Sequence, residues 1–561
     1  MSAVRRAGLA SFLLPLLSFL AVAQPPKAIP SAARLADPDE VRRGLSLLPD
    51  YRGVRADGVK VAVLDYGFDG AGGERPYLPA DAVVVEHYDA DFVRRFGLGD
   101  PDFKKPFTPM NNHGRLMAQI VWAVTGSSPN GPKFYLLNAG GPTLFRRAVR
   151  YAIEQHVDII LFSGHFEGTG NYDGGGPINR AVDEAVAAGI IWVNAAGNDG
   201  GHVYNGPVRE AVDGWLLLAS GRDPTALHLR NRLDENAVTV TLTWNDYRDE
   251  EDAGTAKDLD MYVEDAVGRA VGNSTLRQVT GDRKAGPGET RNPRERVVLA
   301  DLPAADRDYR IRVKRHAGRF GPADWLRILV TSARDVPVPV GKAGRVADAV
   351  QLLDASGRGE IYPPADNRGV ITVGTAAAGC SVGPTADGRS KPDVYLEDPR
   401  ARFTNGEEVG GTSVAAAYFA GAVAVMKASQ PRLQASHILT LARRPVVRAA
   451  SAAVAMPPVA RDPEPLPLSP NEARALRQAE ASLRSRLERG LPPGGVYVTV
   501  PLPRGRTTTL PVEDALRLWD KGGPGAPTPA PTDRGKSPAD AQRQVPIWKT
   551  PGPRLLSEVA S

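Results

Sequence analysis

The fold is decided by the stretch VKVAVLDYG, residues 59–67. An apolar run rich in β-branched side chains leads to Asp65, and Tyr66 and Gly67 end it. A short, continuous apolar run that stops at a turn is typical of a strand buried on both faces. The stretch therefore predicts a buried strand that ends on a carboxylate, at the edge of the sheet where sites form in α/β folds.

Similar short apolar runs recur along the chain, at 133–137, 157–162, 190–194 and 370–374. Between them, apolar residues repeat at helical spacing over 143–155 and 177–188, and Gly189 suits a C-terminal cap for the second helix. Strands that alternate with helices predict an α/β fold with a mostly parallel sheet and helices on both faces.

Residues 205–335 follow a different pattern. Val238, Val240 and Leu242 alternate with threonines, and a second two-residue alternation covers 309–313. Turn residues are dense between these runs, which is typical of antiparallel strands with one buried face. We therefore predict an inserted all-β sandwich at 205–335, which splits one catalytic domain into a first part, 51–204, and a second part, 336–450.

The N-terminus predicts export. Arg5 and Arg6 precede an apolar run over 9–22. The run ends in Ala21-Val22-Ala23, which offers small residues for cleavage, so 1–23 has the pattern of a signal peptide. An uncleaved anchor is the alternative. We expect a secreted or periplasmic protein with no stable membrane span after signal cleavage.

Two further segments flank the folded part. Residues 24–50 form a loose, polar lead-in, and 451–561 form a proline-rich tail in which 471–489 has the composition of a charged helix.

Composition bears on nucleic-acid binding and on how the fold is stabilised. The formal net charge is only +5 over 561 residues. Nucleic-acid binding normally goes with a clustered basic face, so this weakly basic balance leads us to expect no nucleic-acid partner. The single cysteine, Cys380, cannot form an internal disulfide, so stability must come from core packing or bound ions. We expect a monomer.

Three separated segments place a catalytic residue type beside glycine at a structural break: Asp65 before Gly67, His113 before Gly114, and Ser413 after Gly411. His113 and Ser413 each begin an apolar helical segment. The positive end of a helix dipole disfavours a protonated imidazole, which suits a general base. Taken alone, each residue is more often a turn, packing or capping residue.

A fourth segment, Asn194-Ala-Ala-Gly-Asn198, leaves a predicted buried strand. The side-chain amide of Asn198 can donate a hydrogen bond to an oxyanion, and an Asx-turn role is the alternative.

Together, these segments resemble the subtilase (subtilisin-like) family of serine peptidases, in their local sequences and in the chain order Asp, His, Ser. The resemblance covers roughly 51–204 and 336–430. This chain departs from the family pattern at Arg115 and Leu116, where threonine and histidine are usual, and at Ala417, where proline is usual. None of these departures removes a catalytic group.

The resemblance implies an exported serine endopeptidase that acts through an acyl-enzyme, with Ser413 as nucleophile, His113 as general base and Asp65 orienting the imidazole. It implies that Asn198 stabilises the oxyanion. It implies no cofactor for the chemistry.

The resemblance also implies a protein or peptide substrate that binds as an extended strand beside Ser163, Gly164 and His165. His165 either lines the side-chain pocket or points to solvent. Structural calcium is common in the family, and the acidic stretch 246–265 offers oxygen ligands, although it lacks the spacing of a calcium loop and suits a solvated acidic loop better.

Two other functions fit the same residues. A catalytically silent subtilisin-fold binding protein would explain the altered histidine segment and a lead-in, 24–50, that is too short for a folding propeptide. An esterase could use the same three residues, although esterase activity does not follow from the resemblance.

Overall fold

The computed structural model describes residues 54–442 and three C-terminal strands, 497–502, 506–511 and 547–548. Within 54–442 it leaves out 69–77, 109–110, 220–222, 235, 249–253, 282–284, 303–306, 333–337, 341–344, 378 and 405–407. The chain divides into two compact units, one made of Met1–Val446 with Gln544–Ser561 and the other of Val447–Arg543. The predicted signal peptide 1–23, the lead-in 24–50 and the helix at 471–489 lie outside the described residues.

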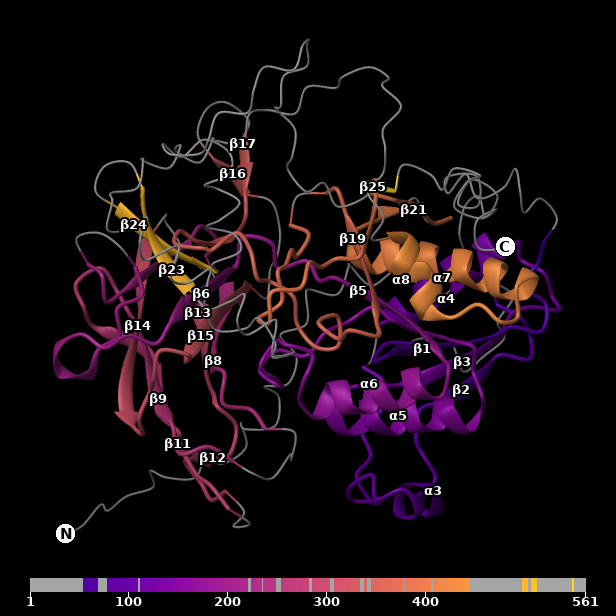
Figure 1. The fold of residues 1–561 in the computed structure, drawn as a ribbon, viewed down its shortest axis with the longest axis horizontal. Coiled ribbons are helices and arrows are strands. Elements are labelled where there is room, and N and C mark those ends of the chain that lie inside the picture. Colours follow the sequence, from indigo (N-terminus) through magenta and orange to yellow (C-terminus); the bar gives the residue numbers. More distant parts are fainter. Residues whose placement is uncertain are drawn as a thin grey trace, which may run out of the picture. The chain divides into compact units, whose positions relative to one another are not determined.

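A parallel sheet is the framework of the first unit (Figure 1). Its order in the described chain is β2-β3-β1-β4-β5-β19-β20-β25, and all its pairings are parallel. The strands are β1 (Lys60–Asp65), β2 (Val83–Val85), β3 (Lys133–Asn138), β4 (Ile159–Phe162), β5 (Ile191–Ala195), β19 (Ile371–Thr375), β20 (Val394–Leu396) and β25 (Ile547–Trp548). The predicted buried strand is β1, and it lies between β3 and β4.

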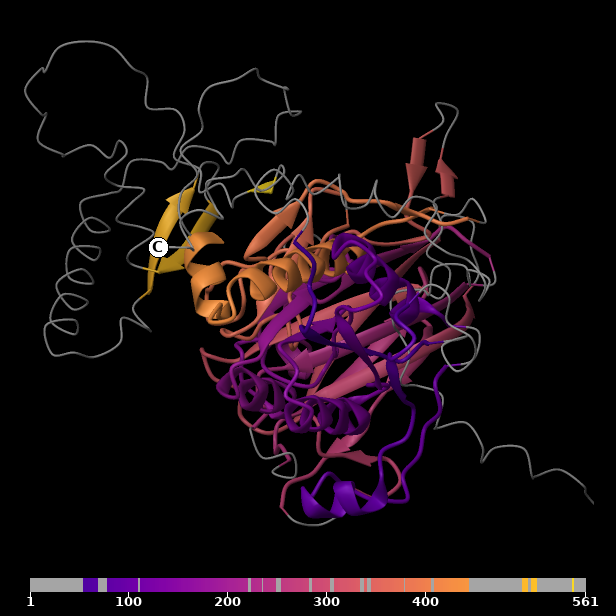
Figure 2. The ribbon, with the colours of Figure 1, turned by 90° about the vertical axis from the view of Figure 1, so that its right-hand side faces the viewer.

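Helices cover both faces of this sheet, as predicted. Val61 and Val63 of β1 pack with α4 (His113–Val124) and α7 (Thr412–Ser429), whereas Ala62 and Leu64 pack with α5 (Pro142–Glu154) and α6 (Pro177–Ala187). Successive side chains of a strand point to opposite faces, so one strand serves both layers. Figure 2 shows the sheet with these helices from the side. The shorter helices are α3 (Ala90–Arg95) and α8 (Ala435–Ala442).

Helix α7 is the central helix of one layer. Among the described residues it alone has the length and hydropathy of a membrane span, but most of it is buried inside the fold. Core packing therefore accounts for its apolar composition.

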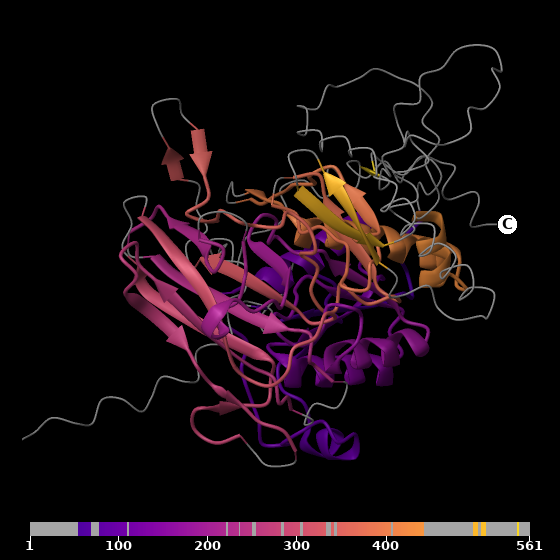
Figure 3. The same ribbon diagram turned by 60° about the vertical axis from the view of Figure 1, so that its left-hand side comes forward.

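An all-β region is inserted between β5 and β19, as predicted (Figure 3). Its two larger sheets are antiparallel and contribute to one apolar cluster. One sheet contains β13 (Arg294–Leu302), β8 (Asn236–Trp244), β15 (Trp325–Ser332) and β6 (Val203–Pro207). The other contains β10 (Ala270–Ser274), β9 (Asp258–Glu264), β14 (Arg307–Ala317), β7 (Leu227–Asn231) and β18 (Val350–Leu352).

The antiparallel strands extend beyond the predicted limits of 205 and 335. β6 begins at Val203 and pairs with β15, and β18 ends at Leu352 and pairs with β7. The remaining described elements are η1 (Val212–Gly214) and four strand pairs: β11 (Arg277–Gln278) with β12 (Glu289–Thr290), β16 (Val338–Val340) with β17 (Arg345–Ala347), β21 (Ala401–Arg402) with β22 (Glu408–Val409), and, in the second unit, β23 (Tyr497–Leu502) with β24 (Arg506–Pro511).

The inserted region packs directly on the loop that follows β4. Tyr172 of that loop shares a small buried cluster with Leu329 of β15, and its hydroxyl forms a 2.8 Å hydrogen bond with Thr243 Oγ1 of β8. Two further hydrogen bonds, of 2.8 and 2.9 Å, join Asn171 to Tyr247. The loop after β4 is therefore held from two sides, by its own sheet and by the insertion.

Candidate active site

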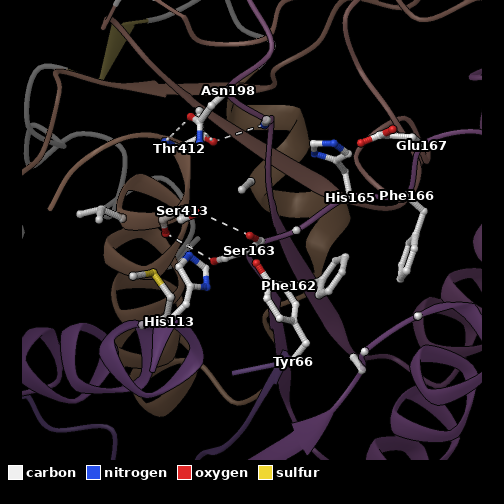
Figure 4. A pocket seen from close by; sticks show the side chains of 18 of the residues that line it. Tyr66, His113, Phe162, Ser163, His165, Phe166, Glu167, Asn198, Thr412 and Ser413 are labelled. Carbon is white, nitrogen blue, oxygen red and sulfur yellow. Dashed lines mark hydrogen bonds between the residues drawn. The ribbon is translucent and has the colours of Figure 1, made fainter. Parts of the chain in front are cut away.

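A cavity of about 350 Å³ lies beyond the carboxyl ends of the central parallel strands (Figure 4). The residues that line it include the predicted functional residues His113, Ser163, Gly164, His165, Asn198 and Ser413. Asp65 lies behind His113 and is not part of the lining. The fold thus brings together residues that are up to 348 positions apart (413 − 65) in the sequence.

Asp65 is a buried carboxylate that three nitrogen atoms contact. Its Oδ1 accepts from the backbone N–H groups of Tyr66 (2.8 Å) and Gly67 (3.1 Å). Its Oδ2 lies 2.6 Å from Nδ1 of His113. Hydrogen bonds to the charged form favour that form. Asp65 is therefore suited to hold the imidazole ring in one orientation.

Two glycines allow this close approach. The backbone N–H of Gly114 donates to the carbonyl oxygen of Gly67 over 2.8 Å. A Cβ atom on Gly114 would lie 2.5 Å from the Cβ of Asp65, and one on Gly67 would lie 2.0 Å from Oδ1 of Asn111. Only glycine fits at such positions without displacing its neighbours. The structure therefore gives a steric reason for both glycines that flank the predicted catalytic residues.

The pKa of His113 is raised above its ordinary value. Burial acts to lower this pKa, but the negative charge of Asp65 and the hydrogen bond from the ring to Asp65 outweigh burial. The sequence-based expectation of a ring kept neutral by the helix N-terminus left out Asp65, which acts in the opposite direction and decides the shift. Asp65 stabilises the imidazolium form.

Ser413 lies in the first turn of α7. The turn before it depends on Gly411, whose φ of +87° is a conformation that favours glycine. The Ser413 hydroxyl donates to the carbonyl oxygen of Ser163 over 3.3 Å, and the Ser163 hydroxyl donates to the carbonyl oxygen of Ser413 over 3.4 Å. In this rotamer the Ser413 hydroxyl donates to Ser163, directly after β4, and not to the imidazole. Such hydrogen bonds often form only once a substrate is bound.

Asn198 is positioned by Thr412, a residue that sequence analysis did not single out. Oδ1 of Asn198 accepts from the backbone N–H of Thr412 (3.2 Å) and from its hydroxyl (3.0 Å). Both acceptor contacts use the amide oxygen. The Nδ2 group therefore stays available as a donor at the pocket.

His165 points into the protein, so the alternative that it points to solvent is wrong. Its side chain is only 10% exposed, and Nε2 lies 3.5 Å from Oδ2 of Asp199. Its ring stacks on Tyr362 with 5.1 Å between the centroids. His165 lines the pocket instead, because it is held between these two neighbours.

One side of the pocket was not predicted from the sequence. Arg294 and Arg296 of the inserted strand β13 line it together with Glu167. Nothing local in the sequence indicates this, because the guanidinium of Arg296 meets the carboxylate of Glu167 across 129 positions.

The structure bears on metal binding and on the reactivity of Cys380. Among the residues that it describes, no group of three or more His, Cys, Asp or Glu side chains is placed to hold a metal ion. In the acidic stretch, Asp246 forms an ion pair with Lys257 at 3.1 Å. Structural calcium stays a prediction. Burial raises the pKa of Cys380 to about 11, so its thiol is poorly suited to act as a nucleophile.

The model of the Subtilase family matches residues 56–457 of this chain. One similar solved structure is that of the CspB protease of Clostridium perfringens, with 15% identity, a TM-score of 0.44, and 73% of this chain and 93% of that chain covered. A second is the nisin leader peptidase NisP from Lactococcus lactis, with 11% identity, a TM-score of 0.32, and 72% of this chain and 88% of that chain covered. A third is MycP1 from Mycobacterium smegmatis, with 14% identity, a TM-score of 0.30, and 76% of this chain and 83% of that chain covered. These likenesses are too remote to support an assignment, which rests on the family model. No curated protein matches the chain.

Proposed function

Since the chain belongs to the subtilase family of serine peptidases, we propose that it is an endopeptidase in which Ser413, His113 and Asp65 cleave peptide bonds through an acyl-enzyme. The observation that carries the proposal is the 2.6 Å contact between Asp65 Oδ2 and His113 Nδ1, in a ring that lines the same pocket as Ser413. A base held by a buried carboxylate beside a serine is the arrangement that activates a hydroxyl for acyl transfer.

In the first half of the reaction, Ser413 rotates its hydroxyl from the Ser163 carbonyl to the imidazole of His113. Its Oγ attacks the carbonyl carbon while the proton passes to Nε2 of His113, and Asp65 stabilises the resulting imidazolium. The tetrahedral intermediate collapses, the C–N bond breaks, and the imidazolium gives its proton to the leaving amine. His113 then takes a proton from water, whose oxygen attacks the acyl carbon. The ester C–O bond to Ser413 breaks, Ser413 takes the proton back from His113, and the carboxylic acid leaves.

The negative charge on the tetrahedral oxygen needs donors that are already in place. The Nδ2 group of Asn198 and the backbone N–H of Ser413 fill this role in the proposal. Oδ1 of Asn198 is already fixed by Thr412, so the amide loses little freedom when Nδ2 donates. The N-terminus of α7 adds the positive end of its dipole.

We extend the proposal to the substrate and to export. A peptide in extended conformation would add beside the backbone of Ser163 and Gly164, where a Cβ on Gly164 would meet the Phe162 ring at 2.9 Å. Export rests on the sequence of 1–23 alone.

The test is cleavage of a mixed peptide library by the purified mature chain, with product masses as the readout. We expect internal cuts by the wild type and none by Ser413→Ala or His113→Ala, because each variant lacks a group that forms or breaks a bond. Ser436→Ala, which changes an exposed serine on α8, is the matched control and should cut like the wild type. A folded wild type that leaves the library intact would favour the catalytically silent binding protein.

A further inference from the structure

One wall of the pocket belongs to the loop between β4 and α6. We call residues 165–169 the pocket wall, and His165 and Glu167 are among those that line the pocket. In Figure 4 the labelled side chains of the pocket wall lie apart from those of His113 and Ser413. The pocket wall therefore borders a part of the pocket beyond the groups that form and break bonds.

The α/β part holds the start of this loop. Nδ2 of Asn194 on β5 donates to the carbonyl oxygen of Gly164 over 3.1 Å. The backbone N–H of Phe166 donates to the carbonyl oxygen of Pro363 over 2.8 Å. Neither partner belongs to the inserted all-β region, so the chain nearest to Ser413 is fixed independently of that region.

The inserted all-β region holds Glu167, in the middle of the pocket wall. The guanidinium of Arg296 on β13 donates to Oε2 of Glu167 over 3.2 Å, and the hydroxyl of Thr241 on β8 donates to the same oxygen over 3.3 Å. Nε of Arg296 also donates to the Thr241 hydroxyl oxygen over 3.3 Å, so the three side chains are joined pairwise. His165 and Asp199 are further titratable groups that act on Glu167. Glu167 is only 7% exposed, so water screens its ion pair little.

Tyr247, shortly after β8, bonds the same loop at two points. Its hydroxyl donates to the carbonyl oxygen of Gly168. Its backbone N–H and carbonyl oxygen bond the side chain of Asn171 over 2.9 and 2.8 Å. Gly168 has a φ of +60°, and a Cβ atom there would lie 2.6 Å from Cδ of Arg294, so only glycine allows this close approach of the insertion. Burial raises the pKa of the Tyr247 hydroxyl, so it stays a donor.

A small acyl group and a peptide depend on these two supports differently. A small acyl group reacts at Ser413 and needs only the contacts close to it. A peptide that fills the pocket also lies against the pocket wall, whose position depends on the insertion. A change that affects substrate binding alone raises KM and leaves kcat nearly constant.

We propose that the inserted all-β region sets the position of the pocket wall for peptide binding, with Arg296 and Tyr247 as positioning residues. This inference rests on the proposed function. Neither residue takes part in bond making, because Arg296 acts through Glu167 and Tyr247 through the carbonyl oxygen of Gly168. The insertion thereby has a role in the reaction as well as in the stability of the first unit.

The test compares one peptide, chosen from those that the wild type cuts in the mixed library, with the small ester p-nitrophenyl acetate. We expect Tyr247→Phe and Arg296→Gln each to raise KM for the peptide about three- to tenfold, the range expected for one lost hydrogen bond, and to leave its kcat nearly unchanged. Hydrolysis of the ester by both variants should match the wild type, because an acetyl group does not reach the pocket wall.

Three further variants complete the design. Tyr262→Phe is the matched control, because it removes a tyrosine hydroxyl that bonds Asp260 over 3.4 Å in the insertion but outside the pocket, and it should change neither substrate. Arg296→Lys keeps the charge and should restore most of the affinity that Arg296→Gln loses. The double variant that combines Arg296→Gln with Glu167→Gln should raise KM by less than the product of the two single effects, because both substitutions remove the same ion pair.

An unchanged KM for the peptide in Tyr247→Phe and Arg296→Gln would overturn the inference. Equal losses with the peptide and with the ester would overturn it as well, because a merely structural role lowers the fraction of active enzyme for every substrate. Tyr247→Phe removes a single oxygen atom and decides the matter even if Arg296→Gln does not fold.

Labelling of each protein with a fluorophosphonate counts the active sites and separates the two levels. A wild type that labels and cleaves, with variants of unchanged KM, refutes the inference alone. A folded wild type that neither labels nor cleaves refutes the proposed function and this inference with it.

Discussion

At Asp65, one carboxylate sets both the orientation and the proton affinity of His113. Its charge and hydrogen bond raise the pKa of His113 despite burial. A general base must be neutral to act, and the neutral fraction falls as the pH drops below the pKa. We therefore expect the acid limb of kcat/KM to lie above the ordinary histidine value of about 6.5.

The measurement is an NMR titration of His113 together with the pH–rate profile. Asp65→Asn removes the charge that raises the pKa, so the His113 titration should move to lower pH. Asp91→Asn changes an exposed carboxylate on α3, and as the control it should leave the His113 titration unchanged. A His113 titration that does not move in Asp65→Asn would contradict the role given to Asp65.

The second prediction at this scale concerns Asn198. If Nδ2 of Asn198 donates only to the tetrahedral oxygen, Asn198→Ala should lower kcat by roughly a hundred- to a thousand-fold and change KM little. Steady-state kinetics on one peptide would measure both. Asn130→Ala, at an exposed loop asparagine, is the matched control. A loss confined to KM would mean that Asn198 binds the ground state.

The candidate site residues that stand in local sequence patterns could be predicted from the sequence. Asp65, His113, Ser413 and Asn198 could be predicted because each lies within two residues of a glycine near the end of a strand or the start of a helix, and because the four segments together resemble the subtilase family. Arg296 and its contact with Glu167 could not, since the contact joins the inserted strand β13 to the loop after β4 and leaves no local pattern.

Helices α4 and α7 carry His113 and Ser413, and their packing holds the two side chains at one pocket. A Cβ atom on Gly421 of α7 would lie 2.6 Å from Cβ of Val124 on α4. We expect Gly421→Ala to separate the helices and to destabilise the fold by about 1–3 kcal/mol.

Thermal and urea unfolding would measure this cost, and peptide turnover should fall with it. Gly321→Ala is the matched control, because that glycine has open space around it and no unusual φ. Equal effects of the two substitutions would contradict the tight contact between α4 and α7.

The parallel strands and their covering helices follow the predicted pattern closely, because buried strands and amphipathic helices leave strong periodic signals. The limits of the inserted all-β region differ from the predicted ones. β6 and β18 have five and three residues and join the antiparallel sheets only through pairing with β15 and β7. Strands this short show too few alternations to be recognised.

At the scale of the whole first unit, the insertion and the α/β part share a buried contact. Tyr172 and Tyr362 lie on the α/β side of it, and Val203 and Leu329 come from β6 and β15. The guanidinium of Arg327 lies 3.8 Å from the ring centroid of Tyr172. Shared burial of this kind couples the unfolding of two parts.

We therefore expect the insertion and the α/β part to unfold in one calorimetric transition. Tyr172→Ala should lower the midpoint temperature of that transition, because it removes a fully buried aromatic side chain and its hydrogen bond to Thr243. Two separate transitions in the wild type, one for each part, would show that the insertion is an independent domain.

The most direct measurement is mass mapping of a fluorophosphonate adduct on the purified wild type and on Asp65→Asn, His113→Ala and Ser413→Ala. We predict one adduct per wild-type molecule, on the peptide that contains Ser413, much slower labelling of the first two variants, and none of the third. An adduct on another residue, or labelling of Ser413 at the same rate in all proteins that retain it, would contradict activation of this hydroxyl by the His113–Asp65 pair.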